Sequence, residues 1–561
     1  MVHFYTNERN HQILIALLKE HKIKNIVASP GTTNSVFVGS IQNDPYFNII
    51  SSVDERSAAY IACGLALESG EPVVISCTGA TAARNYMSGA TEAFYSKLPI
   101  LILTSSQASR NVGHLFAQVT DRSAPPKDTC SISVTMPTVE TPADEWECEV
   151  VANKALTELR RHGGNPVHLN LITTYCYNNT TALTQEVLPS ARVIKRVFQN
   201  DCFPKLEASN VAIFMGSHKP CSKSLTDCID LFCKSHNAIV LVDHTSNYYG
   251  KFRIPMALVI NQSDLNKANT PAYNVDLLIH IGEVSGEEGA MRMIRSKVTW
   301  RVSEDGEIRD TFKNMAYVFE MPESVFFNHY INGNSNITYY KECSKQYQKY
   351  LALQDEQFAL MPFSNVWVAG QIASNIPENS TVVLSILNTL RTWNYSEFKR
   401  GTNVYCPVGG FGIDGATSLL LGASFNDPKK LCFGISGDLA FFYDLNALGN
   451  RHIRNNVRII LINNGVGVEF KKSYAMAYRL LEDEVDTYVA AAGHFGNKSS
   501  KLVKHFAEDL GFTYLSASNK DEFLIAKDMF LAKDSDRPII LECFISADDE
   551  VISLNIIHNR K

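Results

Sequence analysis

Oxygen-bearing side chains follow two strand-like segments in the last third of the sequence. The run KLCFGIS leads into Gly437 and Asp438, and 26 residues later (464 − 438) the run VRIILI ends in Asn463 and Asn464. Ligands of open α/β sheets bind at the carboxyl ends of strands. A carboxylate, an amide oxygen and a backbone carbonyl suit a hard Mg²⁺ ion that keeps positions for phosphate and water. Either pair alone is typical of an ordinary turn, but together they indicate a metal site.

A glycine cluster, GGFGIDG at 409–415, lies between the strand-like NVYCPV and the helix-like ATSLLLGAS. Its backbone can approach an anion closely, and a helix N-terminus follows it, which suits a diphosphate. Gly410, Gly412 and Gly415 also satisfy the dinucleotide pattern G-x-G-x-x-G. The acid expected about 20 residues later for a nicotinamide cofactor is missing, because Asp427 lies in a loop. The cluster therefore favours a diphosphate over a dinucleotide.

Asp54 and Glu55 lie where a short strand, FNIISSV, meets a helix, DERSAAYIACGLALESG. Taken alone, they are typical of a helix start, with Asp54 as the N-cap. Composition alone favours this interpretation, and only the other motifs of the chain could overturn it.

The elements that position these residues alternate between strand and helix along the chain, with short turns. This order is typical of α/β domains with doubly wound parallel sheets. We expect three such domains: an N-terminal domain at 1–185, a central domain at 190–340 and a C-terminal domain at 346–561.

Composition excludes several classes of protein. The formal charge is −6, from 52 basic and 58 acidic residues, which argues against a general nucleic-acid binder. No segment approaches the roughly 18 apolar residues needed to span a bilayer, and the first residues show no secretory leader. None of the 13 cysteines forms a C-x-x-C pair. We expect a cytoplasmic protein with free thiols.

Taken in order, the strings ASPGTTN, DERSAAYIACGLA, CTGATAARNY, LPILILTS, GFGIDG and GDLAFFYDLNAL resemble thiamine-diphosphate-dependent enzymes of the pyruvate oxidase and decarboxylase type. Within that group they are most similar to the 2-succinyl-5-enolpyruvyl-6-hydroxy-3-cyclohexene-1-carboxylate synthase (MenD) family. The resemblance covers the first and third domains well and the central domain only by position. It implies the three-domain thiamine-diphosphate-binding fold, thiamine diphosphate and Mg²⁺ as cofactors, and a homodimer or homotetramer with active sites between subunits.

The resemblance also assigns roles to individual residues. A buried Glu55 would hydrogen-bond the aminopyrimidine ring of the cofactor, and Gln118 matches an active-site glutamine. Ile413 would bend the cofactor. The remaining assignments are the Mg²⁺ ligands Asp438, Asn464 and the carbonyl of Val466, and the cofactor-cleft residues Asn388, Gly412, Asp414, Gly415 and Gly437.

Departures from the synthase pattern concern the substrate. Thr33, Gln107, Trp393 and Val408 stand where that family has arginines that bind carboxylates. Arginine forks are the natural partners of carboxylates, so their loss favours an uncharged donor such as pyruvate. Arg391 could replace one of them.

We therefore expect decarboxylation of a pyruvate-like 2-oxo acid, followed by release of an aldehyde or transfer to an unknown small-molecule acceptor. The alternatives are the synthase reaction with 2-oxoglutarate, a non-catalytic cofactor-binding relative, and a nicotinamide-dependent reductase. We expect no second cofactor in the central domain, where GSHKP and GEVSGEEGAM are the candidate loops.

Overall fold

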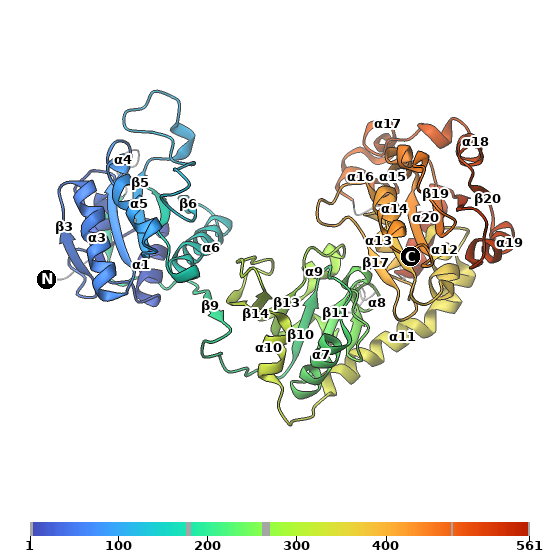
Figure 1. Cartoon of the computed structure of the whole chain (residues 1–561), viewed down its shortest axis with the longest axis horizontal. Coiled ribbons are helices and arrows are strands. Elements are labelled where there is room, and N and C mark those ends of the chain that lie inside the picture. The colour runs from blue at the N-terminus through green and yellow to red at the C-terminus, as the bar shows by residue number, and fades with distance from the viewer. Residues whose placement is uncertain (1–3, 175–180, 261–269, 473–474, 559–561) are drawn as a thin grey trace. The chain divides into compact units, whose positions relative to one another are not determined.

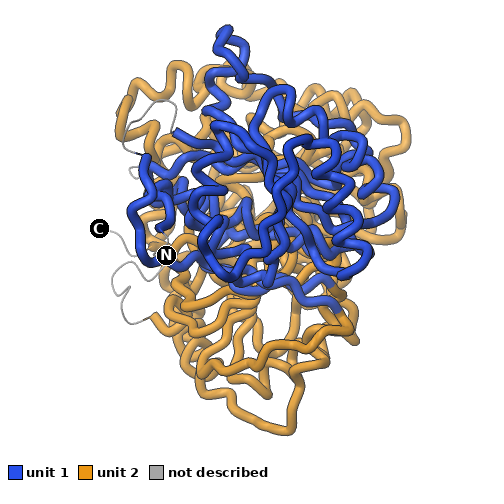
Figure 2. The backbone as a smooth tube through the Cα atoms, turned by 90° about the vertical axis from the view of Figure 1, so that its left-hand side faces the viewer, with its two compact units in different colours: residues 1–198, 306–320 blue, residues 199–305, 321–561 orange. Residues whose placement is uncertain are grey.

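The computed structural model describes residues 4–174, 181–260, 270–472 and 475–558. These residues form two compact units (Figures 1 and 2). Unit 1 comprises residues 1–198 and 306–320, and unit 2 comprises residues 199–305 and 321–561.

Unit 1 is built on a parallel sheet of six strands in the order β3-β2-β4-β5-β7-β6. The chain passes from β2 to β3 on one side and then to β4 on the other, so the strand order reverses between β2 and β4. The strands are β2 Asn25–Ala28, β3 Asn48–Ser51, β4 Val73–Thr78, β5 Ile100–Ser106, β6 Ser133–Met136 and β7 Val167–Ile172. The helices are α1 Arg9–Glu20, α2 Ser35–Ile41, α3 Glu55–Ser69, α4 Ala82–Asn85, α5 Met87–Tyr95 and α6 Pro142–Glu158. Outside this sheet, the antiparallel pair β1 Tyr5–Thr6 and β8 Leu183–Gln185 and the parallel pair β9 Lys195–Phe198 and β15 Met315–Glu320 complete the strands.

Helices cover both faces of this sheet because successive strand residues point to opposite faces. On β5, Leu101 and Leu103 pack in one core with α1, α2 and α6. Ile100 and Ile102 pack in a second core with α3 and α5. The strands are apolar on both faces, which is the pattern of a doubly wound parallel sheet.

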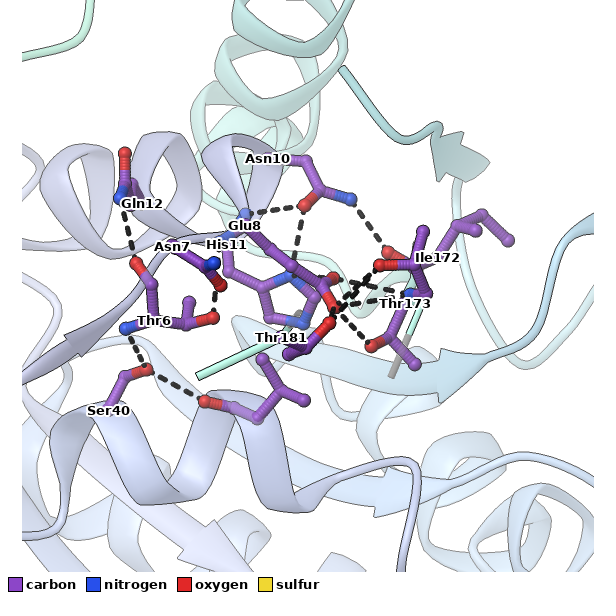
Figure 3. Close-up of polar contacts among 12 residues, drawn as sticks. Thr6, Asn7, Glu8, Asn10, His11, Gln12, Ser40, Ile172, Thr173 and Thr181 are labelled. Atoms are coloured by element: carbon purple, nitrogen blue, oxygen red, sulfur yellow. Dashed lines mark hydrogen bonds and ion pairs between the residues drawn. The ribbon is translucent and has the colours of Figure 1, made fainter. Parts of the chain in front are cut away.

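The start of α1 is fastened to the segment after β7 through the carboxylate of Glu8 (Figure 3). Its Oε1 accepts hydrogen bonds from the hydroxyls of Thr173, Thr174 and Thr181 at 3.0, 3.1 and 2.9 Å, and its Oε2 lies 3.3 Å from Nδ1 of His11. Burial alone would raise the pKa of Glu8, but His11 and the threonine hydroxyls lower it to about 2. The charged carboxylate is therefore a fixed part of the native structure.

Unit 2 contains two parallel sheets. In the first, the strands lie in the order β12-β11-β10-β13-β14, and this order reverses between β10 and β13. Its strands are β10 Val211–Met215, β11 Ala238–Val242, β12 Arg253–Pro255, β13 Asn274–Ile281 and β14 Arg295–Ser303. The helices along this part of the chain are α7 Lys223–Ser235, α8 Met256–Val259, α9 Glu288–Met293 and α10 Glu323–Tyr330. The long helix α11, Thr338–Leu360, leads on toward the second sheet.

The second sheet of unit 2 has six parallel strands in the order β17-β16-β18-β19-β21-β20. The order reverses between β16 and β18. The strands are β16 Thr381–Leu384, β17 Asn403–Tyr405, β18 Cys432–Gly437, β19 Val457–Asn463, β20 Thr513–Ala517 and β21 Ile539–Phe544. The helices are α12 Asn365–Ile372, α13 Asn388–Trp393, α14 Ala416–Asn426, α15 Asp438–Tyr443, α16 Met476–Leu481, α17 Val485–Tyr488, α18 Leu502–Asp509, α19 Lys520–Leu531 and α20 Ala547–Ile557.

Three parallel sheets in a strand–helix alternation confirm the predicted α/β fold class. The predicted domain boundaries stay a prediction, since the compact units group the chain in another way. Within the described ranges, every helix is too short or too polar to cross a membrane.

Candidate active site

The predicted site residues all follow carboxyl ends of parallel strands, and they are distributed over both units. Unit 1 holds Thr33, Glu55, Gln107 and Gln118, which follow β2, β3 and β5. Unit 2 holds Asn388, Arg391, Trp393, Val408, Gly412, Ile413, Asp414, Gly415, Gly437, Asp438, Asn464 and Val466, which follow or end β16, β17, β18 and β19. In each unit the residues lie along the edge where open α/β sheets bind ligands.

Glu55 is the first residue of α3, and it does not cap the helix. The cap is Asp54, whose carboxylate accepts hydrogen bonds from the backbone amides of Arg56 and Ser57 at 3.2 and 3.1 Å. The side chain of Glu55 is half-buried in the single chain, less than the sequence analysis expected. It accepts a 3.1 Å hydrogen bond from Nδ2 of Asn85, the last residue of α4.

Sequence reasoning missed Asn85. The residue lies in the string CTGATAARNY, but its contact with Glu55 depends on how α4 lies beside α3, 30 residues earlier in the chain. No spacing rule connects an amide to a carboxylate over that distance.

Thr33 and Gln107 lie at neighbouring strand ends, whereas Gln118 lies farther along the loop after β5. The hydroxyl of Thr33 donates to the carbonyl of Ser105 at 2.7 Å, so it links the turn after β2 to β5. Gln107 is half-buried and lines a small cavity of about 70 Å³. Gln118 is exposed and has a φ of 62°, which non-glycine residues rarely adopt. A role for each in substrate binding stays a prediction.

The two segments of the predicted metal site are joined directly in unit 2. Oδ2 of Asp438, the first residue of α15, accepts a 2.7 Å hydrogen bond from the backbone amide of Gly465, which follows Asn464. Oδ1 of Asn464 accepts a 3.2 Å hydrogen bond from the amide of Val466. The carboxylate, the amide oxygen and the turn that carries the Val466 carbonyl therefore lie at adjacent strand ends.

The surroundings of Asp438 fit a bound cation. Burial raises the pKa of Asp438 to about 6, and backbone hydrogen bonds, one of them from Gly465, oppose this shift. No basic side chain of the described residues lies within ion-pair distance of its carboxylate, although the residue is only 5% exposed. A divalent ion would supply the missing positive charge.

Neighbouring side chains hold the turn after β19 in place. The side-chain amide of Asn497 donates to the carbonyl of Gly465 at 2.7 Å. Gly465 has a φ of 73°, and a Cβ there would lie 2.2 Å from the side chain of Asn497. Nδ2 of the buried Asn463 donates to Glu542 at 2.7 Å. The turn that carries Asn464 thus depends on a glycine and two amides.

The glycine cluster forms the turn between β17 and α14. Gly415 has a φ of 84° and occupies the N-cap of α14. A Cβ on Gly412 would lie 2.4 Å from Oδ1 of Asp414, so this carboxylate folds back over the turn. Ile413 is half-buried between them.

The turn after β16 is strained and holds a buried polar atom without a hydrogen-bond partner among the described residues. Leu387 has a φ of 60° and a ψ of −122°, a conformation that costs free energy for any residue with a Cβ. The next residue, Asn388, begins α13, and its Oδ1 is buried without a hydrogen-bond partner among the described residues. Gly437, at the end of the neighbouring β18, has Thr389 as its nearest surrounding atom, 3.9 Å from where a Cβ would lie. The unpaired Oδ1 of Asn388 and the space around Gly437 fit a cofactor that donates a hydrogen bond.

The structure places Trp393 and Val408 in the protein core, not on the wall of an open pocket. Both belong to one apolar cluster around the C-terminal sheet. Trp393 is fully buried, its Nε1 donates to Oδ1 of Asn365 at 2.9 Å, and its ring stacks on Phe398. Arg391 is half-buried and forms an ion pair with Glu469, which also binds Lys472 at 2.8 Å.

The loops singled out in the central region meet at a cavity. Ser217, His218 and Lys219 after β10 and Gly282 and Glu283 after β13 line a space of about 560 Å³, together with residues after β14. The prediction that no second cofactor binds there stays a prediction.

Comparison with known proteins identifies the cofactor class. Residues 9–124 match the family described as "Thiamine pyrophosphate enzyme, N-terminal TPP binding domain". Residues 9–124 thus belong to a thiamine-pyrophosphate-binding domain of the kind found in thiamine pyrophosphate enzymes. The matched range includes Thr33, Glu55 and Asn85 and the strands β2 to β5 of the first sheet.

Relatives of this enzyme cover nearly its whole length. A protein of Bacteroides thetaiotaomicron is 28% identical over 560 residues, which is 96% of each chain. A protein of Phocaeicola vulgatus is 28% identical over 568 residues, and one of Flavobacterium psychrophilum is 25% identical over 563 residues, each covering 98% of both chains. All three are named 2-succinyl-5-enolpyruvyl-6-hydroxy-3-cyclohexene-1-carboxylate synthase.

Proposed function

We propose that this chain is a thiamine-diphosphate- and Mg²⁺-dependent enzyme that decarboxylates a 2-oxo acid and transfers the remaining acyl unit to an acceptor. The observation that carries the proposal is the similarity to synthases over 96–98% of both chains, combined with Glu55, Asp438 and Asn464 at strand ends. A cofactor-binding protein without catalysis would not need Glu55. We also propose a cytoplasmic enzyme that works as a homodimer or homotetramer.

Two groups of residues would act on the cofactor. One group would balance the charge of its diphosphate, and the other would activate its ring. Thiamine diphosphate, when bound, supplies a nucleophilic carbon that adds to the carbonyl of a 2-oxo acid and accepts the electron pair left as CO₂ departs. Asp438, Asn464 and the Val466 carbonyl would hold Mg²⁺ against the diphosphate. Glu55 would share a proton with the aminopyrimidine ring, and Asn85 would fix the orientation of its carboxylate.

The remaining predicted residues would shape the cleft. Ile413 would press against the cofactor and bend it, while Gly412, Asp414, Gly415 and Gly437 leave room beside it. Asn388 would offer its buried Oδ1 to a donor of the cofactor. Gln118 would contact the substrate.

The donor in our proposal is a dicarboxylic 2-oxo acid such as 2-oxoglutarate. The name of these relatives describes a product that carries a 2-succinyl group. This four-carbon unit with a carboxylate equals 2-oxoglutarate after loss of CO₂, so carbon and charge balance. Full-length similarity to these proteins favours the same donor class here.

The pyruvate-like donor expected from the sequence has less support. That expectation depended on Trp393 and Val408 as an apolar pocket wall, and both side chains are packed in the core. Nearby, Arg391 and Lys472 both form ion pairs with the carboxylate of Glu469.

The test is a donor comparison with the purified full-length chain, thiamine diphosphate and Mg²⁺. We expect CO₂ release from 2-oxoglutarate with a kcat/KM at least on the order of 10 times that for pyruvate. A preference for pyruvate would restore the uncharged-donor interpretation. Cofactor binding without CO₂ release from any 2-oxo acid would favour the non-catalytic alternative.

A further inference from the structure

Arg122, which the sequence analysis did not single out, reaches back from the loop after β5 to the ligand-binding edge of the first sheet. Its Nη1 donates to Oδ1 of Asn170 on β7 at 3.2 Å, and its Nη2 donates to the hydroxyl of Thr120 at 3.5 Å. A Cβ on Gly79 would lie 1.9 Å from Nη2. The guanidinium therefore lies directly against the backbone of the turn after β4.

This guanidinium is a partly buried cation without an ion-pair partner among the described residues, although the charge of Asp121 acts on it from nearby. No carboxylate lies within ion-pair distance of it in the described part of unit 1, and its Nε is buried without a hydrogen-bond partner. Asp121, the neighbouring acid, uses its carboxylate to accept hydrogen bonds from the amide and hydroxyl of Ser123. Burial lowers the pKa of Arg122, and the positive charge of Arg84 adds to this effect. Cations taken out of water without a partner are costly, so such a site favours an anionic ligand.

The space beside Arg122 suits a small anion. Arg122 lines the cavity of about 70 Å³ together with the polar residues Gln107, Asp121, Ser123, Thr135 and Asn170. A water molecule occupies roughly 30 Å³ in the liquid, so the cavity can hold a group of a few heavy atoms. The five donors of a guanidinium match the two oxygens of a carboxylate.

The position relative to Glu55 links this cavity to the proposed chemistry. Cys77, near the end of β4, experiences the charges of both Glu55 and Arg122. Both groups therefore lie near the end of the same strand, in the same unit.

We propose that Arg122 binds a carboxylate of the substrate, with Gln107 beside it as a neutral hydrogen-bonding group. This inference rests on the proposed function and deepens it, because it names an anionic substrate and the residue that selects it. Arg122 thus performs, from a different position, the carboxylate binding that Thr33 and Gln107 cannot perform as uncharged residues.

The experiment compares Arg122→Gln, which removes the positive charge, with Arg122→Lys. The lysine variant keeps the charge but loses the paired donors of the guanidinium. The control is Arg110→Gln, because Arg110 is an exposed arginine of the same loop. CO₂ release from 2-oxoglutarate alone gives the KM for the donor. Transfer to a hydroxycyclohexadiene carboxylate and to its methyl ester gives the KM for the acceptor.

We expect Arg122→Gln to raise one of these KM values on the order of 10- to 100-fold, Arg122→Lys to raise it less, and Arg110→Gln to leave both unchanged. A rise for 2-oxoglutarate assigns the donor carboxylate to Arg122. A rise for the acceptor acid, absent for its ester, assigns the acceptor carboxylate.

Several results would overturn the proposal. In the first, both KM values stay unchanged. In the second, thiamine diphosphate affinity, measured by calorimetry, falls while both KM values stay unchanged. In the third, the oligomer dissociates in Arg122→Gln, measured by sedimentation, which would make Arg122 a subunit contact. If Arg122→Gln does not fold, the Arg122→Lys variant decides, and an unchanged KM there counts against the proposal.

Failure of the proposed function gives a different result. A wild-type enzyme that releases no CO₂ from any 2-oxo acid would contradict the proposed function. Calorimetric titration of 2-oxoglutarate into the cofactor-loaded wild type and Arg122→Gln still measures the carboxylate site in that case. Equal affinities would then contradict the role of Arg122.

Discussion

The side-chain amide of Asn85 donates a 3.1 Å hydrogen bond to Oε2 of Glu55. This bond leaves Oε1 of Glu55 without a hydrogen-bond partner among the described residues, so that it is available to the cofactor ring, and it fixes the plane of the carboxylate. We expect Asn85→Ala to lower kcat about 5-fold, the value of one hydrogen bond of about 1 kcal/mol, with thiamine diphosphate affinity nearly unchanged. Asn48→Ala is the matched control, because Asn48 donates to Asn25 on the surface of the same unit. Equal turnover in both variants would show that the hydrogen bond from Asn85 does not contribute to catalysis.

Asp54 and Glu55 are adjacent, but their substitution should have opposite effects. Asp54→Ala removes the cap of α3, so we expect a lower midpoint of thermal unfolding with turnover retained. Glu55→Gln keeps the size of the side chain, so we expect an unchanged midpoint and a large loss of turnover. Melting and turnover measured on the same preparations separate the two residues, and a turnover loss confined to Asp54→Ala would reverse the assignment.

Asp438 should control metal-dependent cofactor binding. Its buried carboxylate supplies the negative charge that balances Mg²⁺, so Asp438→Ala should weaken thiamine diphosphate binding at fixed Mg²⁺ by at least on the order of 100-fold. Asp427→Ala is the control, since Asp427 belongs to the G-x-G-x-x-G interpretation and its carboxylate accepts a hydrogen bond from the amide of Lys429 in a surface loop. Calorimetry that shows equal affinity for wild type and Asp438→Ala would contradict the metal site.

His168 should make unit 1 sensitive to mild acid. The ring lies in the first sheet between the hydroxyls of Thr104 and Ser133, at 2.9 and 2.8 Å, and burial followed by the charge of Arg122 lowers its pKa from 6.5 to about 4. The unfolded chain binds this proton first, so stability is unaffected above pH 6.5 and falls as the pH drops from 6.5 toward 4.

By pH 5 the loss amounts to about 2 kcal/mol, since each pKa unit corresponds to about 1.4 kcal/mol. In His168→Gln this part of the loss should disappear. Urea unfolding of unit 1 at pH 8 and pH 5 in both proteins measures it, and an equal pH dependence would show that His168 does not titrate in this way.

Much of the architecture follows from local sequence. Apolar runs such as LPILILTSS become β5 because both faces of the sheet are covered, and the positions of Glu55, Asp438 and Asn464 after strand ends could be predicted from the apolar runs that precede them. Asn85 and Arg122 could not be predicted, because their contacts join segments that only the folded chain brings together.

Trp393 shows a different limit of sequence reasoning. It lies five residues after Asn388 in α13, which rotates it by about 140° from Asn388 around the helix and toward the core. Arg391, three residues after Asn388, lies only about 60° away from it. Closeness to a motif in sequence does not show on which face of a helix a residue lies.

The most direct test of the central claim is the exchange of the cofactor's C2 proton with deuterium. It can be followed by acid quench and NMR in the full-length protein loaded with thiamine diphosphate and Mg²⁺. We predict fast exchange in the wild type and a rate lower on the order of 10²- to 10⁴-fold in Glu55→Gln, because the variant cannot share the proton that activates the ring. A wild-type rate equal to that of the free cofactor, or a Glu55→Gln rate equal to wild type, would contradict the assignment of Glu55 as the activating residue.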